Sequence, residues 1–375
     1  MKQLQGISQN ITETVIGKIT HKKRNLFQSK MEYMIISDIS EIKGYAAILT
    51  DKKKESQISR CKLVHSISDL QSLWNGDIVA IYPNGDIKVL YEITSAHNSL
   101  FLTERCNANC IMCPQPPNNQ AQDNFKQVLH ILSLMDKRTK HIGITGGEPT
   151  LLGDKLFVIL KTIKSKIPKA SVTLLTNAIK LSDFEYAKRF SEINHHDLLI
   201  DVPIYSDTDT EHNKIIRANG FYKSIKGLYN LAKINQKVGI RIVIHMLNYK
   251  RLPQIAEFIY RNFPFVIHIA FMQMEPIGYA RDHIDQLWID PHDYNSELEQ
   301  AINFLVNCDL NVSIYNSQLC ILPDNLRAFA RQSISTWKNI YLDKCSECDV
   351  MTKCPGFFAS SIDYHSNHIK SIKLC

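Results

Sequence analysis

The chain lacks a long hydrophobic run, and this absence excludes one class of protein. Of its 375 residues, 44% are hydrophobic and 22% are charged, an ordinary globular composition that excludes disorder, collagen and coiled coil as descriptions of the whole chain. The longest nearly apolar stretch runs from Phe263 to Met272 and is interrupted by His268. Because that stretch is too short to span a bilayer, the sequence predicts that this is not a membrane protein.

Two further features are weak or missing. The opening residues, Met1 to Gly6, lead into no apolar core, so we expect no secretory signal and a cytoplasmic location. The net charge of +7, from 44 basic and 37 acidic side chains, is too mild to indicate a nucleic-acid partner. Repeats and low-complexity segments are also absent.

The chain has ten cysteines, which stay reduced in the cytoplasm. Clustered reduced cysteines favour metal or redox chemistry over a disulfide framework.

The length suggests two or three domains at about 150 residues each. Residues 1–95 are expected to form a small β-rich domain, because residues 76–82 and 86–91 flank the turn Pro83-Asn84-Gly85 as a hairpin would. Residues 34–36 and 45–49 are further strand candidates there, and the basic runs 21–24 and 52–54 are expected to be solvated loops. Residues 96–285 and 286–375 form the second and third expected domains.

From about residue 98, short β-branched runs alternate with amphipathic helices. The expected strands are 99–103, 141–145, 172–176, 198–204, 240–245 and 266–272, and the expected helices are 125–135, 155–164, 182–189, 222–232 and 251–261. Six β-α units in a row predict an α/β fold with a parallel sheet and right-handed crossovers. A partial barrel and a doubly wound sheet both satisfy this pattern. A helix over 290–307, a strand over 312–315 and a helix over 326–337 are expected to follow.

Three cysteines lie just after the first expected strand. Cys106, Cys110 and Cys113 have the spacing C-x3-C-x2-C. Three thiolates this close can hold three irons of a four-iron four-sulfur cluster, which leaves the fourth iron open to a substrate or cofactor. A structural zinc site needs four protein ligands, and no fourth Cys or His follows closely behind Cys113. The spacing therefore favours the cluster over zinc.

Polar and glycine motifs follow the later strands at corresponding positions. They are Gly146-Gly147-Glu148-Pro149 after the second strand, Thr176-Asn177-Ala178 after the third, Tyr205-Ser206-Asp207 after the fourth and Glu275-Pro276-Ile277-Gly278 after the sixth. All of them fall at the carboxyl ends of strands, the face on which barrel active sites lie. This alignment predicts one site at that face.

Together these motifs resemble the radical S-adenosylmethionine (SAM) superfamily, a resemblance that implies a partial (β/α)6 barrel with the cluster and SAM at its mouth. The candidate SAM-binding residues that it implies are Gly146, Gly147, Glu148, Asn177, Ser206 and Arg217. Glu148 matches the carboxylate that binds the methionine ammonium, and Arg217 resembles an arginine that pairs with the SAM carboxylate. A plain surface arginine is the alternative reading for Arg217. The family's Thr-Asn-Gly turn is changed here, because Ala178 replaces the glycine.

A second cysteine group lies beyond the barrel: Cys320, Cys345, Cys348 and Cys354. Four thiolates at this spacing fit a tetrahedral zinc or an iron–sulfur cluster, and spacing alone does not choose between them. The group resembles the SPASM, or twitch, extension of peptide-modifying radical SAM enzymes, which implies an auxiliary 4Fe-4S cluster. With Cys320 as a ligand that cluster is closed and serves electron transfer or structure. Without Cys320, an open iron is free to bind substrate.

A narrower resemblance covers about residues 75–361. Its segments are 101–107, 113–117, 144–150, 288–291, 313–320, 330–335 and 356–361. They resemble the HxsC-type radical SAM maturases of the His-Xaa-Ser system, which implies a substrate rich in His-Xaa-Ser, a partner maturase of HxsB type and a reductase or flavodoxin-type electron donor. Two alternatives stay open: a radical SAM enzyme acting on RNA or a small molecule, and a non-catalytic iron–sulfur partner of a second maturase.

Overall fold

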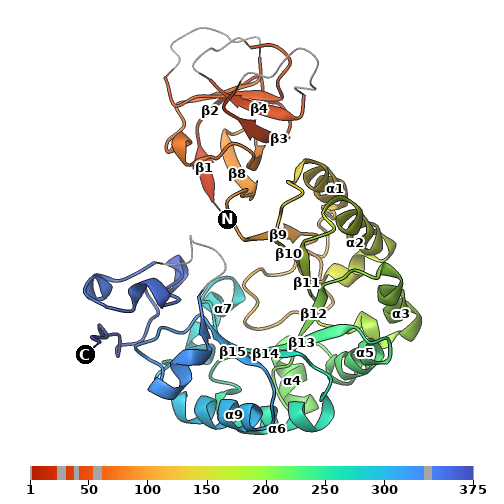
Figure 1. Ribbon diagram of the computed structural model, residues 1–375, viewed down its shortest axis with the longest axis vertical. Coiled ribbons are helices and arrows are strands. Elements are labelled where there is room, and N and C mark those ends of the chain that lie inside the picture. Colours follow the sequence, from red (N-terminus) through yellow and green to blue (C-terminus); the bar gives the residue numbers. More distant parts are fainter. Residues whose placement is uncertain (1, 23–30, 38–41, 54–60, 333–339, 375) are drawn as a thin grey trace. The chain divides into compact units, whose positions relative to one another are not determined.

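The structure is a computed structural model, and it divides the chain into two compact units (Figure 1). It describes residues 2–22, 31–37, 42–53, 61–332 and 340–374. The first unit comprises residues 1–100, 124–142 and 159–170, and the second comprises 101–123, 143–158 and 171–375. The domain boundaries expected at 95/96 and 285/286 stay predictions.

The N-terminal part of the first unit holds an eight-stranded sheet with the order β1-β8-β7-β3-β4-β5-β6-β2. Its strands are β1 (Gln3–Gln5), β2 (Ile7–Gln9), β3 (Val15–Thr20), β4 (Tyr33–Ile36), β5 (Ala47–Leu49), β6 (Leu63–His65), β7 (Ile78–Ile81) and β8 (Asp86–Tyr91). The expected hairpin is confirmed, because β7 and β8 pair antiparallel. The strands expected at 34–36 and 45–49 correspond to β4 and β5. The basic runs are described only at residues 21–22 and 52–53.

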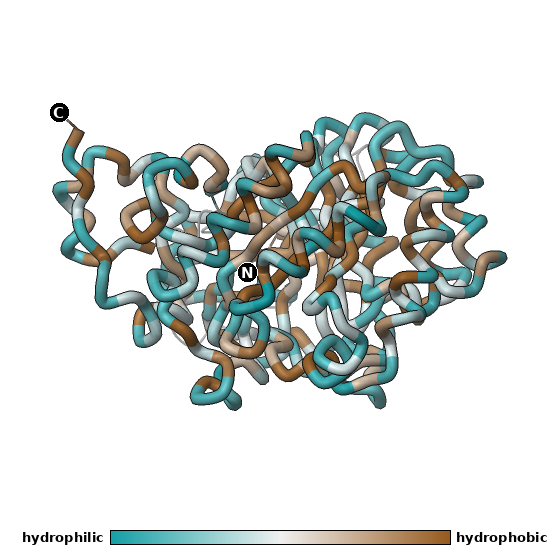
Figure 2. The backbone as a smooth tube through the Cα atoms, turned by 90° about the horizontal axis from the view of Figure 1, so that it is seen from below, coloured by the Kyte–Doolittle hydropathy of each residue, from teal (hydrophilic) through white to brown (hydrophobic). Residues whose placement is uncertain are grey.

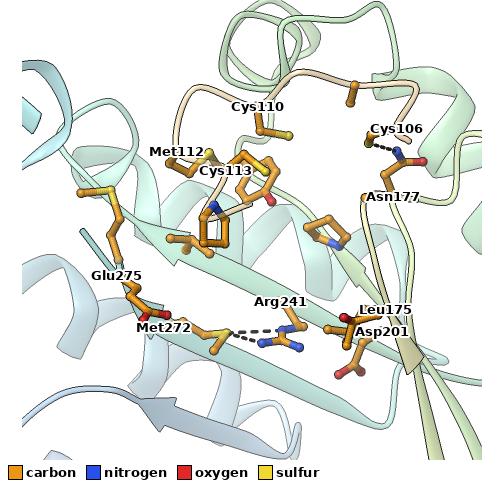
Figure 3. Close-up of a pocket in the computed structure, with 18 of the residues that line it drawn as sticks. Cys106, Cys110, Met112, Cys113, Leu175, Asn177, Asp201, Arg241, Met272 and Glu275 are labelled. Atoms are coloured by element: carbon orange, nitrogen blue, oxygen red, sulfur yellow. Dashed lines mark hydrogen bonds between the residues drawn. The ribbon is translucent and has the colours of Figure 1, made fainter. Parts of the chain in front are cut away.

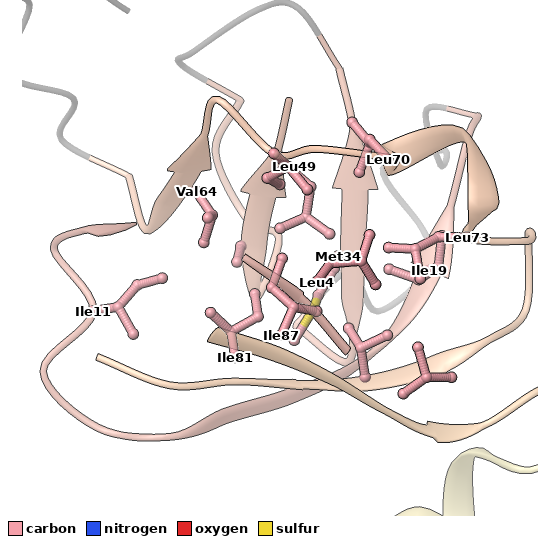
Figure 4. Close-up of a cluster of buried hydrophobic side chains, with 14 residues drawn as sticks. Leu4, Ile11, Ile19, Met34, Leu49, Val64, Leu70, Leu73, Ile81 and Ile87 are labelled. Carbon is pink, nitrogen blue, oxygen red and sulfur yellow. The ribbon is translucent and has the colours of Figure 1, made fainter. Parts of the chain in front are cut away.

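This sheet closes on itself at Gly6. The strands at its two edges, β1 and β2, are consecutive in the chain and only Gly6 separates them, so the two edges must meet. A Cβ on Gly6 would lie 2.7 Å from the side chains of Val64 and Ile67, which leaves room for glycine alone. Buried aliphatic side chains, among them Leu4, Ile19 and Met34, form the core that this closed sheet surrounds (Figure 4).

The second sheet has its eight strands in strict chain order, from β9 at one edge to β16 at the other. They are β9 (His97–Phe101), β10 (His141–Thr145), β11 (Ser171–Leu175), β12 (Leu198–Pro203), β13 (Lys237–Ile244), β14 (His268–Gln273), β15 (Val312–Tyr315) and β16 (Ala330–Arg331). A doubly wound sheet reverses its strand order, and this sheet does not. The α/β partial barrel is therefore confirmed, and the six expected strands lie within three residues of their observed bounds.

Helices fill the crossovers between these strands. They are α1 (Phe125–Leu134), α2 (Asp154–Lys166), α3 (Phe184–Ile193), α4 (Asp209–Ile216), α5 (Phe221–Lys233), α6 (Leu252–Asn262), α7 (Tyr279–Asp282), α8 (Ile284–Leu287) and α9 (Asn295–Asn307). Six of them correspond to predicted helices, and α4 was not expected. The helix predicted over 326–337 is wrong where the structure describes it, because a 3-10 helix over Asp324–Phe329 leads into β16. β16 pairs with β15, and a sheet edge of this kind attracts extended chain that local spacing does not reveal.

The sheet has one apolar face and one polar face. Because alternate residues of a strand share a face, the register of β12 to β15 assigns each side chain to a face. The face toward the helices carries the fully buried Ile200, Ile240, Ile242, Phe271 and Ile314. The inner face carries Asp201, Arg241, Met272 and Tyr315, all of which line one cavity. The helices thus stabilise one face, and the inner face is left free for polar groups.

No helix in the described part of the chain is long and apolar enough to cross a membrane. The longest helices, α2, α5 and α9, have 13 residues each. Figure 2 shows the hydrophobic segments as short brown stretches that alternate with hydrophilic ones along the chain.

Two buried histidines predict how stability depends on pH. Burial lowers the pKa of His212 to about 4 and that of His245 to about 3, and their Nδ1 atoms accept N–H bonds from Tyr205 and Leu247. Unfolded histidine binds a proton near pH 6.5. Lowering the pH from 6.5 to 5.5 should therefore lower the free energy of unfolding, by up to about 1.4 kcal/mol per pH unit for each histidine.

Urea unfolding at pH 7.5, 6.5 and 5.5 measures this slope. The His212→Gln variant should show a smaller slope than the unaltered protein, since the contribution of one buried histidine is removed. An unchanged slope in that variant would show that His212 is not buried as a neutral acceptor.

Candidate active site

The cysteine loop, residues 106–113, is anchored by backbone hydrogen bonds to the end of α4. The N–H of Asn109 donates to the carbonyl oxygen of Ile216 (2.9 Å), and the N–H of Ile111 donates to that of Ile215 (2.9 Å). The last carbonyls of a helix have no partner within the helix, so they are free to accept these bonds. The helix that the sequence did not predict therefore positions the three thiols.

A second contact holds the other end of the loop. The N–H of Tyr279 donates to the carbonyl oxygen of Cys113 (2.9 Å). Gly278 has φ +55°, and a Cβ on it would lie 2.7 Å from the carbonyl oxygens of both Cys113 and Pro114. The backbone at Gly278 thus packs directly against the end of the cysteine loop. Glu275, at the start of the same motif, lines the cavity described below.

The two glycines at 146–147 bring their turn against the backbone just before the cysteine loop. The N–H of Gly147 donates to the carbonyl oxygen of Thr103 (2.6 Å), and the N–H of Glu148 donates to that of Arg105 (2.8 Å). A Cβ on Gly147 would lie 2.4 Å from the Arg105 carbonyl oxygen, and one on Gly146 would lie 2.8 Å from that of Thr103. The glycines are needed here for contact between two stretches of backbone.

Glu148 has a buried carboxylate that joins two turns. Its Oε1 accepts hydrogen bonds from the N–H of Thr150 (3.0 Å), the hydroxyl of Thr150 (2.5 Å) and the hydroxyl of Thr176 (2.6 Å). Its Oε2 accepts one bond, from the N–H of Asn177 (2.7 Å). Burial raises the pKa of this carboxyl and the four hydrogen bonds oppose the rise. Because Oε2 has only one of these donors, it retains capacity to accept another.

Asn177 lies between this carboxylate and the cysteine loop. Its side-chain nitrogen donates to Asn107 Oδ1 (2.6 Å) and lies 4.0 Å from Cys106 Sγ (Figure 3). Ala178 follows with φ +60°, the left-handed conformation that glycine adopts freely and that costs other residues about 1–2 kcal/mol. Ala178 therefore holds a backbone conformation that glycine would adopt without this cost.

One cavity of about 400 Å³ gathers most of the predicted site residues. Those that line it are Cys106, Cys110, Cys113, Gly146, Gly147, Glu148 and Asn177. In Figure 3 the cysteines follow one rim of this cavity, across from Asp201, Arg241 and Met272. The sequence analysis did not identify these last three residues. The polar inner positions of β12 and β13 were the available signal, and only strand register shows where they point.

Ser206 and Arg217 are not in the lining of this cavity. Ser206 is buried, and its hydroxyl accepts the N–H of Thr208 (3.2 Å). Arg217 is exposed at the end of α4, and its guanidinium donates to His283 Nε2 (2.9 Å). Their predicted contacts with SAM stay predictions.

Burial keeps the three loop thiols protonated in the protein alone. It raises the pKa of Cys106 to about 11 and that of Cys110 to about 12, and it also raises the pKa of Cys113. Thiolate rather than thiol is the metal ligand. Iron must therefore displace three protons as it binds.

The second cysteine group converges on a separate small cavity. Cys320, Cys345, Cys348 and Cys354 all line it. The hydroxyl of Tyr341 donates to the carbonyl oxygen of Cys354 (3.1 Å), and the N–H of Ile372 donates to Cys348 Sγ (3.4 Å). The structure thus brings all four thiols together, Cys320 included.

Sulfur spacing distinguishes a single metal ion from a cluster. Tetrahedral zinc with Zn–S bonds of about 2.3 Å holds its sulfurs about 3.8 Å apart. Within the described residues, the one group of three or more potential ligands whose atoms all lie within 4.8 Å is exposed and contains no cysteine; it is His292, Asp293 and His368. Neither cysteine group is that tight, and the C-terminal group is compatible with a second cluster.

A half barrel with a three-cysteine loop at the carboxyl ends of its strands defines a class of enzymes that hold an iron–sulfur cluster at the barrel mouth. Residues 100–259 match the model of the Radical SAM superfamily. This region of the chain is therefore similar to radical SAM enzymes, and enzymes of that superfamily use a 4Fe-4S cluster and SAM.

Curated relatives match about half of the chain. GTP 3',8-cyclase of Clostridium acetobutylicum is 26% identical over 183 residues, which cover 47% of this chain and 55% of the relative. An uncharacterized protein of Methanocaldococcus jannaschii is 30% identical over 191 residues, covering 48% of this chain and 63% of that protein. The chain thus spans little more than half the length of the curated relatives it matches.

Solved structures match with low identity. SuiB of Streptococcus suis is 15% identical, with a TM-score of 0.47, and the match covers 60% of this chain and 50% of that one. The enzyme anSMEcpe with bound AdoMet is 18% identical, with a TM-score of 0.45, and the match covers 58% of this chain and 60% of that one.

Gly278→Ala should lower the iron retained by the cysteine loop after anaerobic reconstitution. The new methyl group would meet the carbonyl oxygens of Cys113 and Pro114, in addition to the backbone strain at φ +55°. Gly153→Ala is a matched control, because Gly153 has φ +58° and its Cβ would meet only Lys180 Nζ at 3.8 Å. Both variants carry strain of about 1–3 kcal/mol, but only Gly278→Ala should lose iron. Equal iron in both would refute the bracing role.

Replacing Cys345 and Cys348 with alanine should halve the iron content. Two four-iron clusters give about eight irons per chain, and loss of one leaves about four. Iron, sulfide and zinc analysis of the reconstituted protein measures this. Four irons and one zinc in the unaltered protein would instead identify the C-terminal group as a zinc site.

Proposed function

We propose that this chain is a radical SAM maturase that modifies a peptide or small protein rich in His-Xaa-Ser. One observation carries the proposal: Cys106, Cys110, Cys113 and Glu148 line a single cavity at the carboxyl ends of the half-barrel strands. When bound, the cluster supplies the electron that cleaves SAM reductively to the 5'-deoxyadenosyl radical, which takes a hydrogen atom from the substrate.

The residues of the chain have distinct roles in this proposal. The three loop thiolates hold three irons and leave one iron position without a protein ligand. Glu148 Oε2 accepts one hydrogen bond within the structure. In this proposal it accepts a further hydrogen bond from the ammonium group of the methionine part of SAM. Asn177 and the turn at Gly146 and Gly147 fix the position of the Glu148 carboxylate relative to the cysteine loop.

The charge of the cavity supports a peptide over a nucleotide triphosphate. Among the described residues that line it, Arg241 alone carries a basic side chain, whereas Glu148, Asp201 and Glu275 carry carboxyl groups. A cavity with more carboxylates than basic side chains opposes the binding of a polyphosphate.

Further support for the peptide comes from the residues outside the barrel. Segments 288–291, 313–320 and 356–361 resemble the HxsC-type maturases, and the C-terminal cysteines resemble the extension of peptide-modifying enzymes. The same resemblance supplies the proposed partners, which are a maturase of HxsB type and a reductase or flavodoxin-type electron donor.

A small-molecule substrate is the second candidate. It is favoured by the 26% identity over 183 residues to GTP 3',8-cyclase of Clostridium acetobutylicum. Anaerobic incubation of the reconstituted protein with SAM, reductant and either a synthetic peptide of His-Ala-Ser repeats or GTP separates the two. Peptide-dependent hydrogen loss supports the maturase, and consumption of GTP supports the second candidate.

The Cys106/Cys110/Cys113 triple-alanine variant should form no 5'-deoxyadenosine with strong reductant, because no iron position remains for SAM. Cys308→Ala, a cysteine at the end of α9 outside both groups, should form it at the unaltered rate. Liquid chromatography of the quenched reaction measures the product. Wild-type formation by the triple variant would refute the proposal, and no formation by the cluster-loaded unaltered protein would identify a non-catalytic partner.

A further inference from the structure

The floor of the cavity contains a carboxylate and a guanidinium on neighbouring strands. Asp201 lies on β12 and Arg241 on β13, and Asp201 pairs with Gly239, two residues before Arg241 on the same strand face. Both residues line the cavity that the cysteine loop covers. Neither has a part in holding the cluster or SAM in the function proposed above, so their polarity needs another explanation.

Asp201 has an unused acceptor atom in a buried position. Its side chain belongs to a residue only 8% exposed, and Oδ1 has no hydrogen-bond partner within the described chain. A Cβ on Gly239 would lie 2.1 Å from that oxygen, so the glycine on the adjacent strand is what leaves room for the carboxylate. A buried acceptor without a partner is costly, which indicates that a bound molecule supplies the missing donor.

Arg241 has unused donors that face the same space. Within the described residues its guanidinium makes hydrogen bonds only to Met272 Sδ, from Nε (3.3 Å) and Nη2 (2.9 Å). A thioether is a weak acceptor. Burial raises the pKa of Asp201, and the positive charge of Arg241 opposes the rise. The two side chains are therefore close enough to interact electrostatically. Met272 thus holds the guanidinium in place without satisfying it.

The unpaired groups of Asp201 and Arg241 complement each other in hydrogen bonding. The floor therefore presents an acceptor at Asp201 and donors at Arg241. Opposite charges cancel across the Asp201–Arg241 pair, and a neutral ligand with both a donor and an acceptor matches it better than an anion does.

We propose that Asp201 and Arg241 form a substrate-anchoring site for the backbone of one peptide residue, whose N–H donates to Asp201 and whose carbonyl oxygen accepts from Arg241. This inference rests on the proposed function and specifies how its substrate is recognised. In an extended peptide, the N–H donor and the C=O acceptor of one residue point to the same side, and together they are neutral. Asp201 and Arg241 lie across the cavity from the cysteine loop (Figure 3).

Kinetics of the reconstituted holoenzyme test the site, with a synthetic peptide of His-Ala-Ser repeats as the probe. Arg241→Met and Asp201→Asn should each raise the peptide KM by about ten- to hundredfold, since each loses a hydrogen bond to a charged group. Formation of 5'-deoxyadenosine without peptide should stay unchanged. Lys237→Met is the matched control, because Lys237 lies on the same face of β13, four residues earlier, and pairs with Asp197 outside the cavity.

A change in the peptide provides a second test that does not depend on the folding of a variant. Replacing the peptide amides one at a time by esters removes single N–H donors. The ester at the anchored position should weaken peptide binding to the unaltered enzyme. It should have little effect on peptide binding to the Asp201→Asn variant, because that variant already lacks the carboxylate that accepts from the amide N–H. Arg241→Lys, which keeps the charge but not the fork of donors, should give an intermediate KM.

The outcomes separate this inference from the proposed function. A peptide KM that is unchanged in Arg241→Met and Asp201→Asn, while the unaltered enzyme responds to peptide, overturns the anchoring site alone. No response of the unaltered enzyme to peptide, with consumption of GTP, overturns the peptide substrate and the site with it. A raised KM in both variants and normal behaviour of Lys237→Met supports the site.

Discussion

The parallel register of the half-barrel strands is the constraint on which the rest of the site depends. Because β11 to β16 pair in parallel and in chain order, every one of these strands ends at the same edge of the sheet. Motifs separated by tens of residues in the chain therefore meet in one cavity. The helices between the strands cover the apolar outer face, and this burial stabilises the arrangement without using the inner face.

Close backbone contacts turn this general arrangement into a specific site. Glycines at 147 and 278 allow carbonyl oxygens to approach to distances that no side chain would permit. Together with the end of α4, they hold the cysteine loop on three sides. Glu148 then links the turns after β10 and β11 through its buried carboxylate. The geometry of the thiols is thus set by backbone packing, which a change of surface residues leaves intact.

The inner face differs from that of a complete barrel. Complete barrels fill the interior with layers of bulky aliphatic side chains, whereas here Asp201, Arg241 and Tyr315 take inward positions. An open sheet leaves space that a substrate can occupy, so the inner groups need not satisfy one another. The cavity lining contains more carboxyl groups than basic side chains, which suits the neutral peptide proposed above better than a polyphosphate.

The sequence by itself determined the strands, the order of the β-α units and the metal-binding residue types. β-branched runs and cysteine spacing act within a few residues, so a local pattern reveals them, and the six expected strands were correct to within three residues. Pairing over long distances is not local. The tertiary structure alone decided between a partial barrel and a doubly wound sheet, and it introduced α4 as the support of the cysteine loop. Within the described part of the helix expected at 326–337, it formed a 3-10 helix and the edge strand β16 instead. It also brought Asp201 and Arg241 to one cavity floor, because strand register, which depends on the whole sheet, decides which face of a strand meets the interior.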